Sequence, residues 1–210
     1  MVDAREILKS ICADASCVDA LSGVYEFFHW LEELIEQLPR PRVSGVEQPL
    51  VQNVKNREEI AARLRVLGVE DEDVVDYVVA RLVSRHHREL VDEHYREASP
   101  GGVCPVCGQV PTLLVVREKP ALGFAALEVG ARCICGYEKP MEGLTCPRCG
   151  ETSYDSFKVL VAPQGLLRVF ECSRCGHRFA EVRGDAFGER ELQAFHGAVR
   201  LLLKLRDGEQ

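Results

Sequence analysis

The stretch that decides the fold runs from position 104 to 176 and carries four short cysteine motifs, each followed by glycine: C104PVCG108, C133ICG136, C146PRCG150 and C172SRCG176. Eight of the ten cysteines in the 210-residue chain lie in these motifs. A C-x-x-C-G turn directs two sulfurs at one point, and its glycine accommodates the tight backbone. Two such turns from opposite ends of a hairpin complete a tetrahedral site of four thiolates.

In chain order the pairs define two candidate metal sites, the first formed by Cys104, Cys107, Cys133 and Cys135, and the second by Cys146, Cys149, Cys172 and Cys175. Crossed pairing between the two halves is the open alternative. Cys133 and Cys135 are separated by one residue instead of two, so we expect the first site to be strained or to have one ligand replaced. The second site has regular spacing and is expected to be the more robust.

A tetrahedral set of four thiolates fits zinc or a single iron ion of the rubredoxin kind, and iron–sulfur clusters use other spacings. The chain is therefore expected to hold two metal ions, iron or zinc. Zinc would be structural, whereas iron could carry one electron. A unit of this size buries too little apolar surface to fold alone. Metal binding can supply the missing folding energy, on the order of 10 kcal/mol for structural zinc.

Each half of the cysteine region begins and ends with a cysteine motif. Between the two motifs lie two apolar runs joined by a turn. The two halves begin 42 residues apart, which indicates an internal repeat. The sequence therefore predicts two tandem rubredoxin-like or zinc-ribbon modules, at 101–145 and 146–184.

The first hundred residues follow a helical pattern. Apolar residues at positions 18, 21, 25, 28 and 35 share one helical face, which predicts a helix from an N-cap at Ser16 to the prolines at 39 and 41. Further helices are predicted at about 56–67, 70–97 and 189–206. The segment Ser99-Pro100-Gly101-Gly102 is the best domain boundary. The predicted fold class is α+β, with a helical domain at 1–100, the two cysteine modules, and a C-terminal helix at 185–210.

The charge is uneven along the chain. Residues 1–100 carry 12 Lys/Arg and 20 Asp/Glu, a net of −8, whereas residues 101–210 carry 14 and 13, a net of +1. Proteins that bind nucleic acid usually show a basic stripe that displaces counterions from phosphates. None is visible here, so no nucleic-acid partner is expected.

The N-terminus lacks a secretory signal, and no stretch approaches the ~18 apolar residues of a membrane span. We therefore expect a cytoplasmic protein with no membrane insertion. In that compartment paired cysteines are metal ligands or redox thiols more often than disulfides. Cys12 and Cys17 are expected to act as small buried apolar residues.

The chain shows neither a phosphate-binding G-x-x-x-x-G-K-[ST] loop nor a G-x-S-x-G nucleophile motif. A dithiol oxidoreductase would carry its C-x-x-C at a helix N-terminus near a βαβ pattern, which is also absent. No catalytic residue is predicted, and the protein is not expected to be an enzyme.

The order of the motifs resembles the FdhE family, the accessory proteins of formate dehydrogenase. The likeness rests on C104PVCGQVP111 directly after a helix, on Cys135, and on the gaps of ten and 22 residues that flank C146PRCG150 before C172SRCG176. Cys133 is displaced by one position from the family's pattern. The resemblance implies a helical N-terminal domain followed by two rubredoxin-like modules associated with iron. It also implies a cytoplasmic maturation factor that contacts the catalytic subunit of formate dehydrogenase.

Two alternatives remain at this point. One is a zinc-ribbon module that binds nucleic acid, in which four arginines face phosphates and two phenylalanines stack on bases: Arg168, Arg174, Arg178, Arg183, Phe170 and Phe179. The other is a small iron redox protein. The sequence leaves the oligomeric state open.

Overall fold

The computed structural model describes residues 4–12, 14–95, 102–121, 124–162 and 165–205. Its six α-helices are α1 (Ala4–Ile11), α2 (Ala15–Ile35), α3 (Arg57–Val66), α4 (Glu72–His86), α5 (Arg88–Tyr95) and α6 (Glu189–Leu205) in the described parts of the chain. The strands are β1 (Leu113–Ala121), β2 (Phe124–Arg132), β3 (Glu138–Met141), β4 (Phe157–Val161), β5 (Leu167–Cys172) and β6 (Arg178–Arg183). The predicted α+β class is confirmed.

The N-terminal helices differ from the predicted ones at two places. Asp14 caps α2, because its side chain accepts a hydrogen bond from the Cys17 backbone N–H at 2.8 Å, so the N-cap predicted at Ser16 is wrong. The helix predicted over 70–97 is divided at His87, where the backbone leaves helical geometry with φ −123° and ψ 26°. The His87 ring meets the Pro41 carbonyl oxygen at 3.0 Å, a long-range contact that no local pattern reveals.

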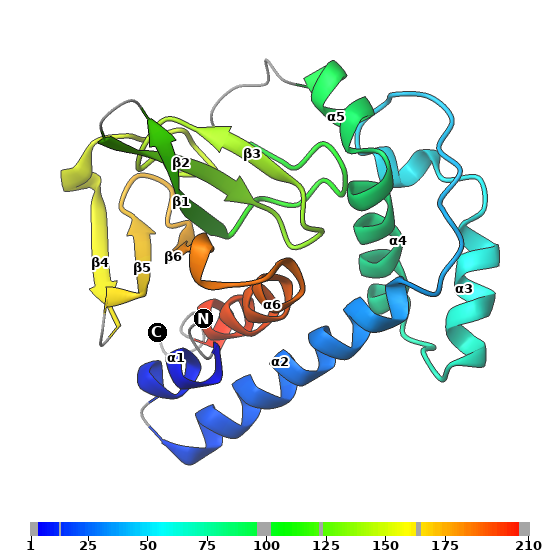
Figure 1. The fold of residues 1–210 in the computed structure, drawn as a ribbon, viewed down its shortest axis with the longest axis horizontal. Coiled ribbons are helices and arrows are strands. Elements are labelled where there is room, and N and C mark those ends of the chain that lie inside the picture. The colour runs from blue at the N-terminus through cyan, green and yellow to red at the C-terminus, as the bar shows by residue number, and fades with distance from the viewer. Residues whose placement is uncertain (1–3, 13, 96–101, 122–123, 163–164, 206–210) are drawn as a thin grey trace.

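The strands form one six-stranded sheet in the order β3-β2-β1-β6-β5-β4 (Figure 1). Within each cysteine segment the neighbouring strands are antiparallel. The two segments meet at a parallel pair, β1 with β6, in which Leu113 lies opposite Ala180 and Val116 opposite Arg183. The ribbons are thereby joined edge to edge. The division into four domains stays a prediction, and its first boundary falls largely on residues 96–101, outside the described residues.

The two faces of the sheet have different neighbours. Leu113 and Val115 of β1 point toward α6, α1 and α2, whereas Leu114 between them points to the opposite face and contacts the second cysteine cluster. Helix α6 lies between the sheet and α2 (Figure 1). The α2–α6 contact is so close that a Cβ on Gly197 would collide with the Phe28 ring.

Cys12 and Cys17 form a disulfide that ties the end of α1 to the start of α2. Their predicted role as free buried apolar residues is therefore wrong, although both still pack partly against the α1–α2–α6 core. None of the helices in the described residues has the length and apolar character needed to cross a membrane.

Candidate metal centres

The first candidate site brings four sulfurs together. The Sγ atoms of its cysteines all lie within 4.8 Å of one another. The Cys104–Cys135 pair is 3.6 Å apart and the Cys107–Cys133 pair 3.3 Å. A tetrahedral metal with metal–sulfur distances of ~2.3 Å requires sulfurs about 3.8 Å apart, whereas a disulfide requires ~2.05 Å. The spacing therefore fits a four-thiolate metal site.

The second site has the same arrangement. Its sulfurs also lie within 4.8 Å of one another, with 3.7 Å between Cys146 and Cys175 and 3.8 Å between Cys149 and Cys172. The structure thus groups the cysteines in chain order and does not cross the pairs between segments. Ligation of a metal by these eight residues remains a prediction that the geometry fits.

Each site is built by two tight turns. The glycine after every pair has a positive φ, between 70° and 85°, a conformation that favours glycine: Gly108, Gly136, Gly150 and Gly176. In the regular turn the Cys104 N–H donates to the carbonyl oxygen of Gln109, five residues on. In the short turn the Cys133 N–H donates to Tyr137, four residues on, at 2.9 Å. The turn at Cys133 is thus one residue shorter than the turn at Cys104, and the Cys133 sulfur still lies in the cluster.

The first site is embedded in the protein. Cys133 and Cys135 are fully buried and Cys104 nearly so, while Cys107 is half-buried. The surrounding core includes Val83 of α4 and residues of the 3-10 helix Leu50–Asn53, whose Leu50 N–H donates to the Pro105 carbonyl oxygen at 2.9 Å. Burial raises the pKa of the Cys135 thiol well above its ordinary value, so ionised sulfurs at this depth need a cation beside them.

The second site lies against a small aromatic cluster on the sheet. The rings of Phe170 and Phe179 stack with centroids 5.3 Å apart, and Phe157 meets both edge-on. Cys149 and Cys175 are half-buried, so two of the four sulfurs approach the surface. The second site is therefore surrounded by this aromatic cluster, whereas the first site is surrounded by a core that also includes α4 and the 3-10 helix Leu50–Asn53.

His177 connects the second site to the first segment. Its ring packs on Phe179, and its Nε2 lies 2.9 Å from the Pro111 carbonyl oxygen. The His177 ring is half-buried in this position. Burial also lowers the pKa of His177.

The residues named for the nucleic-acid alternative have other contacts. Phe170 and Phe179 are buried in the cluster on the sheet and cannot stack on bases from these positions. All four arginines pair with glutamates, namely Arg168 with Glu181, Arg174 with Glu151, Arg178 with Glu171 and Arg183 with Glu118.

The difference in burial predicts unequal metal release, in the opposite order to the one expected from cysteine spacing, which favoured the second site as the more robust. Zinc-loaded protein mixed with excess chromogenic chelator should lose metal in two phases, the faster from the second site because two of its sulfurs approach the surface. A Cys172→Ser variant should lack the fast phase and keep the slow one. Release in a single phase, or a fast phase that persists in the variant, would contradict this assignment.

Together the two sulfur clusters, the shared sheet and the helices that cover it define a class, an α+β protein with two embedded ribbon-type cysteine sites. Comparison with models of known families gives no match, and comparison with curated proteins gives none either. Among solved structures the chain is similar to the crystal structure of the FdhE protein from Pseudomonas aeruginosa, with 16% identity and a TM-score of 0.41. The match covers 86% of this chain, which spans 65% of that chain's length. The family named there is the one that the order of the cysteine motifs resembles.

Proposed function

We propose that this protein is an accessory factor in the maturation of formate dehydrogenase, that it binds the catalytic subunit, and that both sulfur clusters hold resident metal ions. The observation that carries the proposal is the pair of four-sulfur clusters, formed in the chain order whose motifs and gaps resemble the FdhE family. Zinc in these clusters would be structural, and iron would allow transfer of one electron. The chain itself would assist the enzyme without catalysing the formate reaction.

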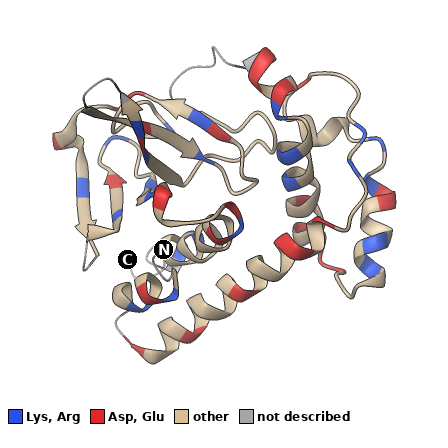
Figure 2. Ribbon diagram, viewed as in Figure 1, with Lys and Arg blue, Asp and Glu red and all other residues tan. Residues whose placement is uncertain are grey.

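The acidic helical half offers a surface for the client. Acidic residues recur along the α2 ribbon in Figure 2, and Glu26 and Glu33 are exposed. Two aromatic residues lie between these glutamates in the sequence: Phe27 is 40% exposed and Trp30 is 41% exposed. Their ring centroids are 5.9 Å apart. Large aromatic residues at a surface are typical of the centres of protein interfaces. We therefore place the client contact on this side of α2.

Anaerobic co-purification with the catalytic subunit tests the proposal. The wild-type chain should retain the subunit, and a Trp30→Ala variant should retain at least about tenfold less, as expected for an aromatic residue at the centre of an interface. The matched control is Val66→Ala on α3, which also removes an exposed apolar side chain, 84% exposed, and should bind like the wild type.

A deletion strain supplies the second readout. Formate dehydrogenase activity should be lost without the protein and restored by the wild-type gene. No retained subunit together with unchanged activity in the deletion strain would reject the proposed function. Metal analysis and an absorption spectrum of the same anaerobic preparation would distinguish iron from zinc, and a colourless protein with two zinc ions would reject an iron redox role.

A further inference from the structure

A polar cavity of about 650 Å³ lies beside the first site, between α4, the end of α2, the start of α6 and the β1–β3 side of the sheet. Six arginines line it: Arg81, Arg85, Arg88, Arg117, Arg132 and Arg190. Four glutamates face them: Glu32, Glu36, Glu138 and Glu189. The lining side chains alone carry two more positive than negative charges, in a chain whose formal net charge is −7. Two further carboxylates lie just outside the lining, Asp92 at 3.7 Å from Arg88 and Glu33 at 3.5 Å from Arg190.

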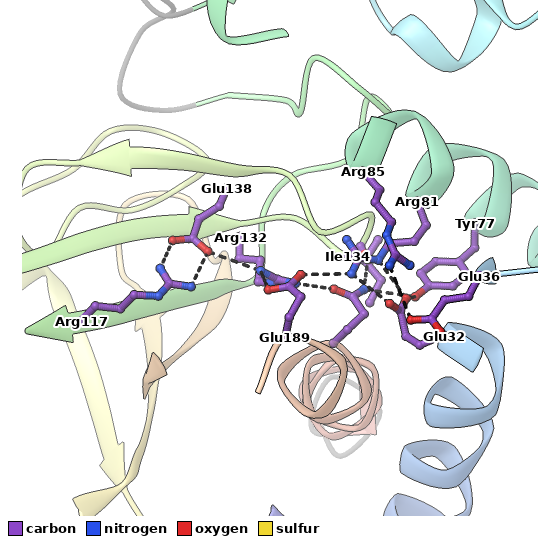
Figure 3. Close-up of polar contacts among 11 residues, drawn as sticks. Glu32, Glu36, Tyr77, Arg81, Arg85, Arg117, Arg132, Ile134, Glu138 and Glu189 are labelled. Carbon is purple, nitrogen blue, oxygen red and sulfur yellow. Dashed lines mark hydrogen bonds and ion pairs between the residues drawn. The ribbon is translucent and has the colours of Figure 1, made fainter. Parts of the chain in front are cut away.

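The floor of the cavity is built by two buried arginines. Arg81 is 4% exposed and Arg132 2%. Arg81 grips Glu32 with two hydrogen bonds of 2.8 and 2.9 Å, and both arginines contact Glu189 at the start of α6 (Figure 3). These bonds fix the guanidinium groups before any ligand arrives, which reduces the ordering cost of binding.

Two guanidinium donors beside the cavity are left over after these pairings. The Nε of Arg132 is buried without a hydrogen-bond partner, and the Nη1 of Arg81 has none among the described residues. The Arg81 group lies directly over Gly136, where a Cβ would collide with it. A native fold rarely leaves a buried donor unmatched, so the Arg132 Nε points to a missing acceptor.

The arginines at the mouth of the cavity are only weakly paired with carboxylates. Ser84 and Arg85 follow Arg81 one turn further along α4, and Arg88 is the first residue of α5; all of them line the cavity. Arg88 is 65% exposed and its nearest carboxylate, on Asp92, is 3.7 Å away. Arg85 lies 3.5 Å from Glu36 at the limit of a hydrogen bond. A ligand at the mouth can therefore recruit both guanidinium groups.

We propose that this cavity binds a phosphate-type oxyanion, either free phosphate or the phosphoryl group of a small ligand. Arginine forks match the oxygens of such an anion with paired, charge-assisted hydrogen bonds. The cavity volume lies within the range of small-molecule sites, roughly 300–1,000 Å³. The inference depends neither on the proposed client nor on which metal the sulfur clusters hold.

Calorimetric titration with inorganic phosphate and with pyrophosphate, at constant ionic strength against chloride, tests the proposal. Saturable binding is expected, with a shift of the Gly136 amide signal in a nitrogen–proton correlation spectrum. Binding of both probes indicates a site for free phosphate, whereas binding of pyrophosphate alone indicates one for the phosphoryl groups of a larger ligand. No saturable binding of either probe overturns the proposal.

Two substitutions at the mouth give opposite expected results. Arg88→Ala should weaken binding about tenfold, and the matched control Arg42→Ala, which removes an exposed arginine paired with Glu59, should leave it unchanged. Glu36→Gln removes a competing carboxylate and should strengthen binding about two- to fivefold, a gain that misfolding cannot produce. Equal affinity in the two arginine variants, or weaker binding by Glu36→Gln, overturns the proposal.

Discussion

A Cys135→Ser variant is expected to purify with one metal ion instead of two and to lose the cooperative unfolding of the helical half. A structural metal contributes about 10–16 kcal/mol, and whole domains are stable by only about 5–15 kcal/mol. Cys135 is fully buried in the cluster that also contains Val83 of α4 and Val91 of α5, so an empty first site leaves uncompensated polar groups in a shared core. Metal analysis and the fluorescence of Trp30, the single tryptophan, measure the two effects.

Cys172→Ser is the matched control, because it removes one sulfur from the second site. It should also purify with one metal ion and should loosen residues 146–182. The Trp30 transition should survive, since the second site packs on the sheet and not on α4. Loss of both metal ions in either variant would show that the two sites do not bind metal independently. A Trp30 transition that persists in Cys135→Ser would show that the first site does not stabilise the helical half.

An Arg81→Met substitution should lower the free energy of unfolding by about 3–5 kcal/mol. Removing one partner of a buried ion pair leaves the other charge without compensation, and Glu32 is only 3% exposed. The Tyr77 hydroxyl donates a hydrogen bond to Glu32 at 3.3 Å. Burial raises the pKa of Tyr77, so the hydroxyl stays protonated and keeps this bond, but a neutral donor only partly compensates the stranded carboxylate. Urea denaturation followed by Trp30 fluorescence measures the loss.

The double variant Arg81→Met with Glu32→Leu should recover part of that loss, because it removes the stranded carboxylate as well. Arg65→Ala is the surface control: its ion pairs with Glu58 and Glu72 are solvent-exposed, so the change should cost about 1 kcal/mol or less. A cost for Arg81→Met no greater than that of Arg65→Ala would show that the buried pair does not stabilise the helical half.

Local rules account for what the sequence predicts well. The cysteine turns are specified by residues two to five positions apart, so the two sulfurs of each turn and the role of Gly108 or Gly150 can be inferred from spacing alone. Which two turns share a site joins more distant residues, and spacing left a crossed arrangement open. The end of α3 before Gly68, with a φ of 83°, follows from the same kind of signal. The fold class follows because helical and strand periodicities occupy different parts of the chain.

Contacts between distant residues account for what sequence reasoning missed. Arg81 and Glu32 are 49 positions apart, and each reads alone as a charged residue on a solvated helix face. The contact of His87, where the helix breaks, is with Pro41, 46 positions away. The Cys12–Cys17 disulfide is the exception, because it joins residues only five positions apart and was missed for another reason: it depends on how α1 turns into α2. The parallel pairing of β1 with β6 also lacks a short-range signal, because it joins the first strand of one segment to the last strand of the other.

That parallel pairing has a consequence for the order in which the chain can fold during synthesis. Strand β1 leaves the ribosome long before β6, and until β6 arrives only β2 covers one of its edges. An uncovered strand edge is a template for pairing with other chains. A nascent or truncated chain that ends before Arg178 is therefore exposed to aggregation through β1, and completion of the last strand protects the first.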